Sequence, residues 1–331
     1  MYCSRVCQIN DWNKSGGQQH KLFCGKTGEV GHCLEIKPAG EKGMGLFATR
    51  DFAKDEMLMA ERPILSYDNL YLFSNLRKSE QIAIMNLAPN KGDLNDKFKM
   101  NKFGNSGHLY VHMSRVNHDC YGNSSYMHLN HRDDVQILVA KKAIKAGEEI
   151  TFAYKHLLYN TPAERRQELR QTYGIFCERQ CRICSNPTLE KRARELSQAQ
   201  RSYLTYLRDC CNGTHKIEMD LDHVLELGSK LLKFYDEFEV HASPYIQLLN
   251  QLSICCMIRN QEIKKCRKFL DEAMVISLAF TGSDSESAPV QEVKQLQLFL
   301  NSKMYTNADA GDMLTHALWE MISVFLAEGT V

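Results

Sequence analysis

The residues of this chain best suited to chemistry lie between positions 114 and 123, in the sequence Ser-Arg-Val-Asn-His-Asp-Cys-Tyr-Gly-Asn. Asn117 and His118 stand side by side, and a cysteine follows at position 120. Small and turn-forming residues close the segment, which predicts a loop. Polar side chains on a loop are well placed to contact a ligand, although a plain surface turn explains the same residues equally well.

Three cysteines within eight residues form a pattern that is typical of metal binding. They are one ligand short of a closed tetrahedral zinc site, which takes four nitrogen or sulfur ligands. Cys120, in the loop above, is a candidate for the fourth ligand, and the alternative is a reduced cysteine cluster without a metal. The three cysteines are Cys177, Cys181 and Cys184.

A second group of residues with zinc-ligand spacing lies at the N-terminus. The chain has 13 cysteines and no recognisable secretion signal. These features suggest a reducing compartment, cytoplasmic or nuclear, where clustered cysteines bind metal more often than they form disulfides. The alternative is that four residues are merely scattered in a polar leader. The group consists of Cys3, Cys7, His20 and Cys24.

The composition is that of a globular chain, with 44% hydrophobic and 24% charged residues. A length of 331 residues suggests two or three domains. The net charge is +1 and no long basic block stands out, so we expect no direct binding to nucleic acid. No apolar run is long enough to span a membrane, so we expect no membrane partner.

Short strands and turns are expected around the polar loop. Residues 34–66 have the pattern of short strands, interrupted by a glycine-rich turn at 40–45 whose spacing differs from that of a dinucleotide-binding motif. Helical spacing covers residues 70–90, whereas residues 91–108 are polar and irregular. Two further strands are predicted at 135–140 and 150–154.

Helices are expected in the rest of the chain. Thr161, Pro162 and Glu164 form a strong helix start, and this helix should run to Tyr173 and stop at Gly174. From residue 187 the pattern is almost wholly helical, which indicates a helical-repeat or bundle domain whose apolar stripes form its core. The expected helices lie near 188–209, 217–239, 244–259, 261–280, 289–303 and 308–328.

Several motifs, taken together and in order, resemble a SET-domain protein methyltransferase. They are Lys-Gly-Met-Gly-Leu-Phe-Ala at 42–48, Arg-Val-Asn-His-Asp-Cys-Tyr-Gly-Asn at 115–123, and Gly-Glu-Glu-Ile-Thr-Phe-Ala-Tyr at 147–154. The cysteines at 177–184 resemble a post-SET zinc site, so the match covers about residues 34–184. The N-terminal leader resembles the second half of a MYND zinc finger, and the whole order is similar to fungal MYND-SET and SMYD-group proteins.

The resemblance implies an α+β fold, in which a SET-domain β-fold with a knot-like crossing precedes an all-α C-terminal domain. The earlier cysteines of a full MYND finger are not in this sequence, so we expect a half finger that binds zinc weakly or not at all. The expected domains are a partial MYND-type finger at 1–24, a SET domain at 34–156 with a helical insert at about 70–112, a post-SET helix and cysteines at 157–186, and a TPR-like or bundle domain at 187–331.

The resemblance also implies an S-adenosylmethionine-dependent protein-lysine N-methyltransferase that acts on a histone or another protein. Tyr154 matches the catalytic tyrosine of the family, and Phe176 matches an aromatic residue that packs on the adenine of the cofactor. The other residues that match cofactor-binding positions are Lys42, Gly43, Met44, Gly45, Leu46, Asn117 and His118. The residues that match zinc ligands are Cys120, Cys177, Cys181 and Cys184.

Two positions depart from the family's pattern. Gly122 stands where the loop motif usually has a proline, and this glycine would loosen the loop. The first two cysteines of the cysteine motif are separated by three residues, where the family usually has one residue between them. Gly122 and the half finger leave a second hypothesis open, in which a catalytically weak SET-like module acts as a scaffold and binds a protein partner through its helical domain. A zinc-dependent hydrolase finds no support, because the sequence has no His-Glu-x-x-His motif.

Overall fold

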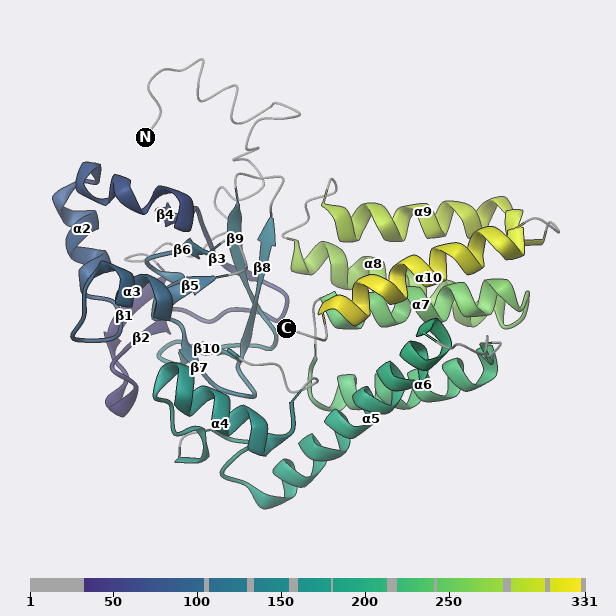
Figure 1. Cartoon of the computed structure of the whole chain (residues 1–331), viewed down its shortest axis with the longest axis horizontal. Coiled ribbons are helices and arrows are strands. Elements are labelled where there is room, and N and C mark those ends of the chain that lie inside the picture. The colour runs from purple at the N-terminus through teal and green to yellow at the C-terminus, as the bar shows by residue number, and fades with distance from the viewer. Residues whose placement is uncertain are drawn as a thin grey trace, which may run out of the picture. The chain divides into compact units, whose positions relative to one another are not determined.

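The structure, a computed structural model, divides the chain into two compact units (Figure 1). The first contains Met1–Tyr154 and Glu168–Cys177, and the second contains Lys155–Gln167 and Glu178–Val331. The predicted half finger at residues 1–24 lies outside the described residues. Those described are 33–103, 107–129, 134–154, 160–179, 181–212, 219–240, 243–281, 287–306 and 310–328.

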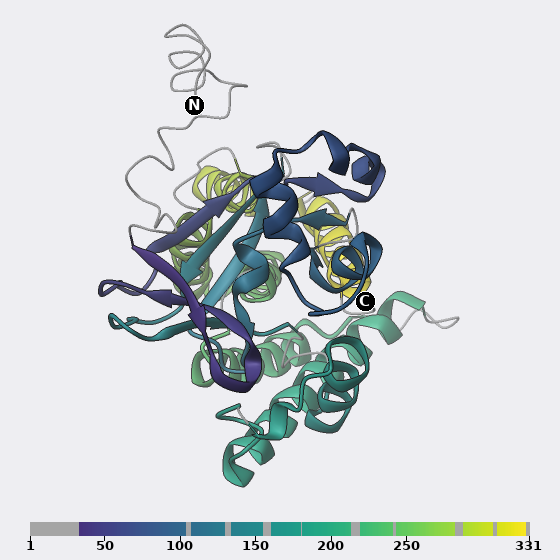
Figure 2. The ribbon, with the colours of Figure 1, turned by 90° about the vertical axis from the view of Figure 1, so that its left-hand side faces the viewer.

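The first unit contains the strands (Figure 2). In chain order they are β1 (Leu34–Pro38), β2 (Met44–Ala48), β3 (Met57–Glu61), β4 (Leu65–Ser66), β5 (Lys102–Phe103), β6 (His108–Leu109), β7 (Asn117–His118), β8 (Ser124–Leu129), β9 (Val135–Ala140) and β10 (Glu149–Phe152). They form three small sheets with the strand orders β1-β2-β10-β7, β3-β9-β8 and β4-β6-β5. The SET-like motifs at 42–48, 115–123 and 147–154 all contribute to the four-stranded sheet.

The four-stranded sheet brings distant parts of the sequence together. β1 and β2 are antiparallel and are joined by a short 3-10 turn, η2 (Gly40–Lys42), followed by Gly43 with a φ of 84°. This confirms the predicted glycine-rich turn, because positive φ is readily adopted by glycine. β7 runs parallel to β10 with the pairs Thr151↔Asn117 and Phe152↔His118. Residues 117 and 118, expected in a loop, are therefore held in a two-residue strand.

One hydrophobic core supports both the four-stranded sheet and the sheet that contains β9. Leu46 from β2, Leu138 from β9 and Ile150 from β10 are all fully buried in it. All six residues of β9 are buried, as expected for a strand covered on both faces. Tyr154 packs against this core from its edge.

The insert between the sheets differs from the prediction. The helical pattern at 70–90 is divided into a 3-10 helix, η3 (Tyr67–Asn75), and α2 (Lys78–Met85). The stretch expected to be irregular contains α3 (Leu94–Asn101), β5 and β6. The Asp93 side chain accepts from the amide of Asp96 at 3.0 Å, and Asp96 accepts from the amide of Asp93 at 3.1 Å. Aspartate thus takes the place of the glutamate of a usual capping box, which hid the helix start.

The helix after the SET-like motifs agrees with the prediction. α4 spans Pro162–Tyr173. The Thr161 amide donates to Glu164 Oε2 at 2.7 Å, and the Glu164 amide donates to Thr161 Oγ1 at 3.4 Å. Gly174 follows with a φ of 68°. The capping box and the glycine stop are both confirmed, because each depends only on neighbours in the sequence.

The second unit is helical beyond the cysteines, close to the predicted boundaries. α7 contacts α6, α8, α9 and α10 and is buried along most of its length, as expected for a central helix. None of the helices in the described ranges is both long enough and apolar enough to cross a bilayer. The helices are α5 (Pro187–Asn212), α6 (Leu221–Glu237), α7 (Ser243–Ile258), α8 (Ile263–Phe280), α9 (Ala288–Ser302) and α10 (Ala310–Glu328).

Candidate functional site

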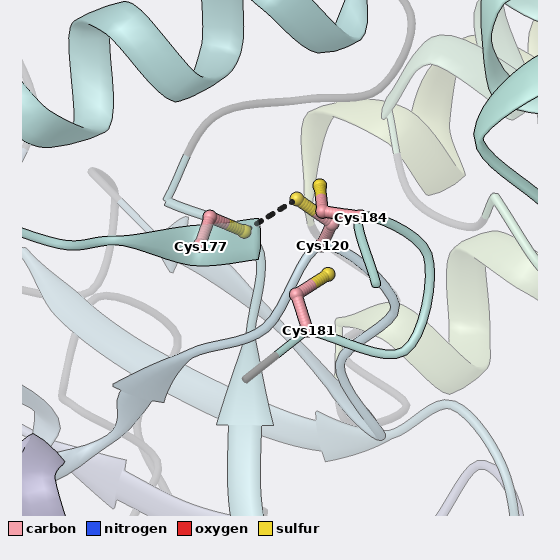
Figure 3. Close-up of side chains that lie close together, drawn as sticks. All are labelled: Cys120, Cys177, Cys181 and Cys184. Atoms are coloured by element: carbon pink, nitrogen blue, oxygen red, sulfur yellow. Dashed lines mark hydrogen bonds between the residues drawn. The ribbon is translucent and has the colours of Figure 1, made fainter. Parts of the chain in front are cut away.

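The predicted zinc ligands form one group of four buried cysteines (Figure 3). Their sulfur atoms all lie within 4.8 Å of one another. A tetrahedral zinc with zinc–sulfur bonds of about 2.3 Å places its sulfurs about 3.8 Å apart, so the donor set fits this metal. The group, which the sequence motifs predicted, consists of Cys120, Cys177, Cys181 and Cys184.

Cys177 joins this group despite the unusual spacing of the cysteine motif. It begins a short 3-10 helix, η6 (Cys177–Arg179), which takes up part of the longer interval to Cys181. Its sulfur lies 3.4 Å from the sulfur of Cys120 (Figure 3). The longer spacing therefore does not remove Cys177 from the candidate metal site.

His118 lies between the cysteines and Tyr154. Its Nε2 atom is 3.4 Å from the sulfur of Cys120 and 3.4 Å from the sulfur of Cys177. Its Nδ1 atom accepts a hydrogen bond from the amide of Tyr154 at 3.0 Å. Both ring nitrogens thus face protein atoms, although the sequence predicted that this side chain holds a cofactor.

Tyr154 is held at both its backbone and its hydroxyl. The hydroxyl donates to the carbonyl of Val116 at 2.8 Å. The ring contacts those of His118, Phe152 and Tyr173, with centroids 5.3, 5.3 and 5.1 Å away. Burial raises the pKa of Tyr154 above its ordinary value, with smaller contributions from Tyr173 and Glu149. The hydroxyl is therefore a protonated hydrogen-bond donor at neutral pH.

A carboxylate that the sequence analysis did not select connects two predicted cofactor-binding residues. Glu149 Oε2 accepts from Lys42 Nζ at 2.8 Å, and Glu149 Oε1 accepts from Asn117 Nδ2 at 2.8 Å. The same Asn117 amide group also lies 3.2 Å from the carbonyl of Met44. Glu149 belongs to the third SET-like motif, but its partners lie far away in the sequence, so residue spacing alone did not identify its role.

The glycine turn leaves room for a ligand to approach the backbone. A Cβ at Gly45 would come within 2.9 Å of both Glu149 Oε1 and Asn117 Nδ2, so a larger residue would displace these two side chains. A Cβ at Gly43 would have nothing within 4 Å, so the backbone there faces open space. Among the described residues, no hydrogen bond is made to Asn117 Oδ1, which leaves an acceptor for a ligand's ammonium group. These features fit a cofactor that carries an amino acid.

The remaining predicted cofactor residues differ in their exposure. Phe176, which directly precedes Cys177, is 43% exposed, and the Arg170 guanidinium lies 4.9 Å from its ring centroid. The Met44 side chain is also exposed. Leu46 is fully buried in the core, so only its backbone could contact a cofactor.

The backbone at Gly122, where the family usually has a proline, lies closely against β10. A Cβ at Gly122 would lie 2.4 Å from the carbonyl oxygen of Thr151 and 2.6 Å from the Cα of Phe152. The neighbouring Asn123 fixes the loop to β10, because it donates to the carbonyl of Glu149 and accepts from the amide of Thr151, both at 2.9 Å. Glycine is needed here for close approach of two backbones.

Comparison with known proteins identifies the region that contains Asn117, His118, Glu149 and Tyr154. Residues 43–155 match the SET domain family. The chain therefore carries a SET domain, with its strands in the N-terminal part and a mostly helical C-terminal region.

Three fungal proteins, each named histone-lysine N-methyltransferase SET5, are weakly similar to the chain. That of Saccharomyces cerevisiae is 34% identical over 103 residues, covering 29% of this chain and 18% of that protein. That of Eremothecium gossypii is 31% identical, covering 33% and 20%, and that of Candida albicans is 29% identical, covering 32% and 22%. The matched stretch thus spans less than a quarter of the length of each relative.

A solved structure also aligns with the chain, but the alignment does not support a shared fold. It is a humanized mutant of the Chaetomium thermophilum Polycomb Repressive Complex 2 bound to the inhibitor GSK126, 12% identical, covering 82% of this chain and 32% of that one. The TM-score of 0.24 is too low to support any conclusion.

Proposed function

We propose that this chain is an S-adenosylmethionine-dependent protein-lysine N-methyltransferase that acts on a histone or another protein. The SET domain match and the three similar histone-lysine methyltransferases support this activity. The observation that carries the proposal is the parallel pairing of β7 with β10. It places Tyr154 beside His118 and places Asn117 beside the glycine turn, as one catalytic and cofactor-binding region requires.

The residues around the glycine turn would hold the cofactor. When bound, S-adenosylmethionine supplies an electrophilic methyl group on a positively charged sulfur. The open backbone at Gly43 and the Oδ1 acceptor of Asn117 suit the amino-acid part of such a molecule. The exposed ring of Phe176 suits stacking against its adenine. The proposed binding residues are Lys42, Gly43, Met44, Gly45, Leu46, Asn117 and Phe176, whereas both ring nitrogens of His118 face protein atoms.

Tyr154 would orient the reacting lysine of the substrate protein. A free lysine has a pKa of about 10.4, so its ammonium must lose a proton before it can attack. An apolar channel and a neighbouring positive charge both disfavour the ammonium form. The protonated Tyr154 hydroxyl, which donates a hydrogen bond to the carbonyl of Val116 in this structure, can bind and align the amine of the substrate lysine. Methyl transfer is an in-line displacement, so such alignment contributes much of the rate.

The four cysteines would bind a structural zinc ion. Cys120 belongs to the loop that follows β7, and Cys177 follows α4, so a shared metal would fix these segments to each other. We further propose that the loop at 119–123 forms the knot-like crossing of the SET fold. Asn123 in this loop makes two hydrogen bonds to β10. A partial MYND finger at 1–24, a nuclear or cytoplasmic location and a protein partner of the helical region complete the proposal.

A transfer assay with methyl-labelled S-adenosylmethionine tests the proposal. The purified chain is incubated with core histones and, separately, with whole-cell lysate, while calorimetry measures cofactor binding. We expect label on lysine side chains of protein substrates that requires the chain. Cofactor binding without transfer would instead support the second hypothesis, a SET-like interaction scaffold. If the chain shows no cofactor binding and no methyl transfer, the assignment as an enzyme is contradicted.

A further inference from the structure

The amide of Tyr154 lies just beyond the hydrogen-bonded ladder of β7 and β10. The last pair of that ladder is Phe152↔His118. Two residues later, the backbone donor of Tyr154 is accepted by the His118 side chain, at Nδ1. The imidazole thus continues the pairing of the strand after the main-chain partner has ended.

This hydrogen bond determines which nitrogen of His118 carries the proton. An amide N–H can only donate, so Nδ1 must offer its lone pair. In a neutral imidazole the other nitrogen then carries the hydrogen, so Nε2 is an N–H donor. That nitrogen lies 3.4 Å from the sulfurs of both Cys120 and Cys177. His118, Cys120 and Cys177 are all buried, so water does not compete freely for these contacts.

Direct coordination of a metal by His118 does not fit the same geometry. Coordination through Nε2 would need a lone pair on that nitrogen and would move the ring proton to Nδ1. The Nδ1 proton would then oppose the amide proton of Tyr154 at a nitrogen–nitrogen distance of 3.0 Å. Thiolates bound to a metal remain good hydrogen-bond acceptors, so a donor at Nε2 is the consistent arrangement.

We propose that His118 is a positioning residue that joins the metal-binding cysteines to the backbone of Tyr154. Its Nε2–H supports Cys120 and Cys177 as ligands, and its Nδ1 fixes the segment that carries Tyr154. The side chain therefore acts on the cofactor region through Tyr154 and not by holding the cofactor itself. This inference rests on the proposed function for the role of Tyr154 and on zinc as the metal.

Two substitutions separate the two halves of this connection. In His118→Asn, the amide oxygen takes the place of Nδ1 and the donor at Nε2 is lost. In His118→Gln, the longer amide reaches the place of Nε2 and the acceptor for Tyr154 is lost. Loss of a ligand-supporting hydrogen bond typically lowers metal affinity by about 10- to 100-fold. We expect His118→Asn to show this loss in competition with a chromophoric zinc chelator, and His118→Gln to retain affinity close to that of the wild type.

A spectroscopic measurement on the wild-type chain tests the proposal without any substitution. Nitrogen-15 NMR of the zinc-loaded full chain should show His118 as the neutral tautomer with its proton on Nε2. Zinc affinity unchanged in His118→Asn, or a proton on Nδ1 in the wild type, would overturn the proposal. Both readouts are independent of methyl transfer, so an inactive wild-type chain would contradict the proposed enzyme but not this connection.

Discussion

At the scale of single residues, the Tyr154 hydroxyl is the group whose removal should be most informative. Tyr154→Phe keeps the ring contacts and removes the hydrogen bond to Val116, so unfolding free energy should fall by only about 1 kcal/mol. Methyl transfer should fall sharply while cofactor binding survives, because the lost interaction acts in the transition state. Labelled transfer, calorimetry and denaturant titration measure the three effects.

Tyr110→Phe is a matched control for this substitution. Its hydroxyl also donates to a main-chain carbonyl, that of Asp134, at 2.6 Å, and Tyr110 lies in the same core as Tyr154. We expect a similar loss of stability with normal methyl transfer. Wild-type turnover in Tyr154→Phe would remove Tyr154 from the catalytic role, and loss of cofactor binding would make it a binding residue.

Glu149 should control cofactor affinity through the two residues that it holds. In Glu149→Gln, one of the two acceptor oxygens becomes an NH₂ group, which then faces the donor of either Lys42 or Asn117. We expect cofactor binding about tenfold weaker, equivalent to about 1.4 kcal/mol. Glu148→Gln is the control, because Glu148 is adjacent and exposed, and its side chain accepts only from the nearby Lys145 amide among the described contacts. Equal affinities in both variants would contradict this role.

His112 should make stability depend on pH. The hydrogen bond that His112 donates to the Glu61 carboxylate raises the pKa of His112 above its ordinary value, and desolvation opposes this shift. Because the folded pKa is the higher one, this stabilisation is complete below about pH 6.5 and is lost as pH rises through the folded pKa. The difference in unfolding free energy between the wild type and His112→Gln should therefore shrink above about pH 6.5. A difference that grows with rising pH would contradict the assignment.

At the scale of elements, local sequence signals predicted the helices well. α4 begins at its Thr161–Glu164 capping box and ends before Gly174, and both signals lie within the helix's own sequence. The six later helices agree with their periodic apolar patterns to within a few residues. Such elements are predictable because their start, stop and buried face depend on neighbours three or four positions away.

Elements that depend on long-range pairing were missed. β7 has only two residues and exists because β10 pairs with it in parallel. β8 (Ser124–Leu129) begins with two serines and has little apolar alternation, yet it pairs along its whole length with the buried β9. Similarly, the cysteine group followed from a family resemblance, whereas the contacts of His118 and Glu149 depend on the tertiary structure. Spacing along the chain does not record which side chains the sheet brings together.

Gly122 should be essential to the contact between its loop and β10. Gly122→Ala places a Cβ 2.4 Å from the Thr151 carbonyl oxygen, which belongs to the backbone and cannot turn aside. We expect a loss of about 2–3 kcal/mol in unfolding free energy, as for overpacking in a core. Gly311→Ala, where a Cβ meets nothing within 4 Å, should leave stability unchanged or slightly higher. Similar melting behaviour of the two variants would contradict the close approach.

At the scale of the whole molecule, the SET domain accounts for only part of the chain. The family match ends at residue 155, and the helical unit contains a second set of buried cysteines. Burial raises the pKa of Cys255 to about 12, that of Cys256 to about 11 and that of Cys266 to about 12. These side chains are therefore thiols at neutral pH in the metal-free chain. Among the described residues, the group of side chains that converges as metal ligands would is Cys120, Cys177, Cys181 and Cys184.

The chain should bind zinc through its SET-associated cysteines and not through those of the helical core. Cys181→Ser removes one of the four converging sulfurs, so we expect the loss of one zinc equivalent and a lower melting temperature. Cys266→Ser changes an equally buried thiol whose sulfur contacts the Ser253 carbonyl, and its zinc content should equal that of the wild type. Elemental analysis of the purified chains gives both values. An unchanged zinc content in Cys181→Ser would show that the four cysteines do not form the metal site, since a tetrahedral centre cannot lose a thiolate without losing affinity.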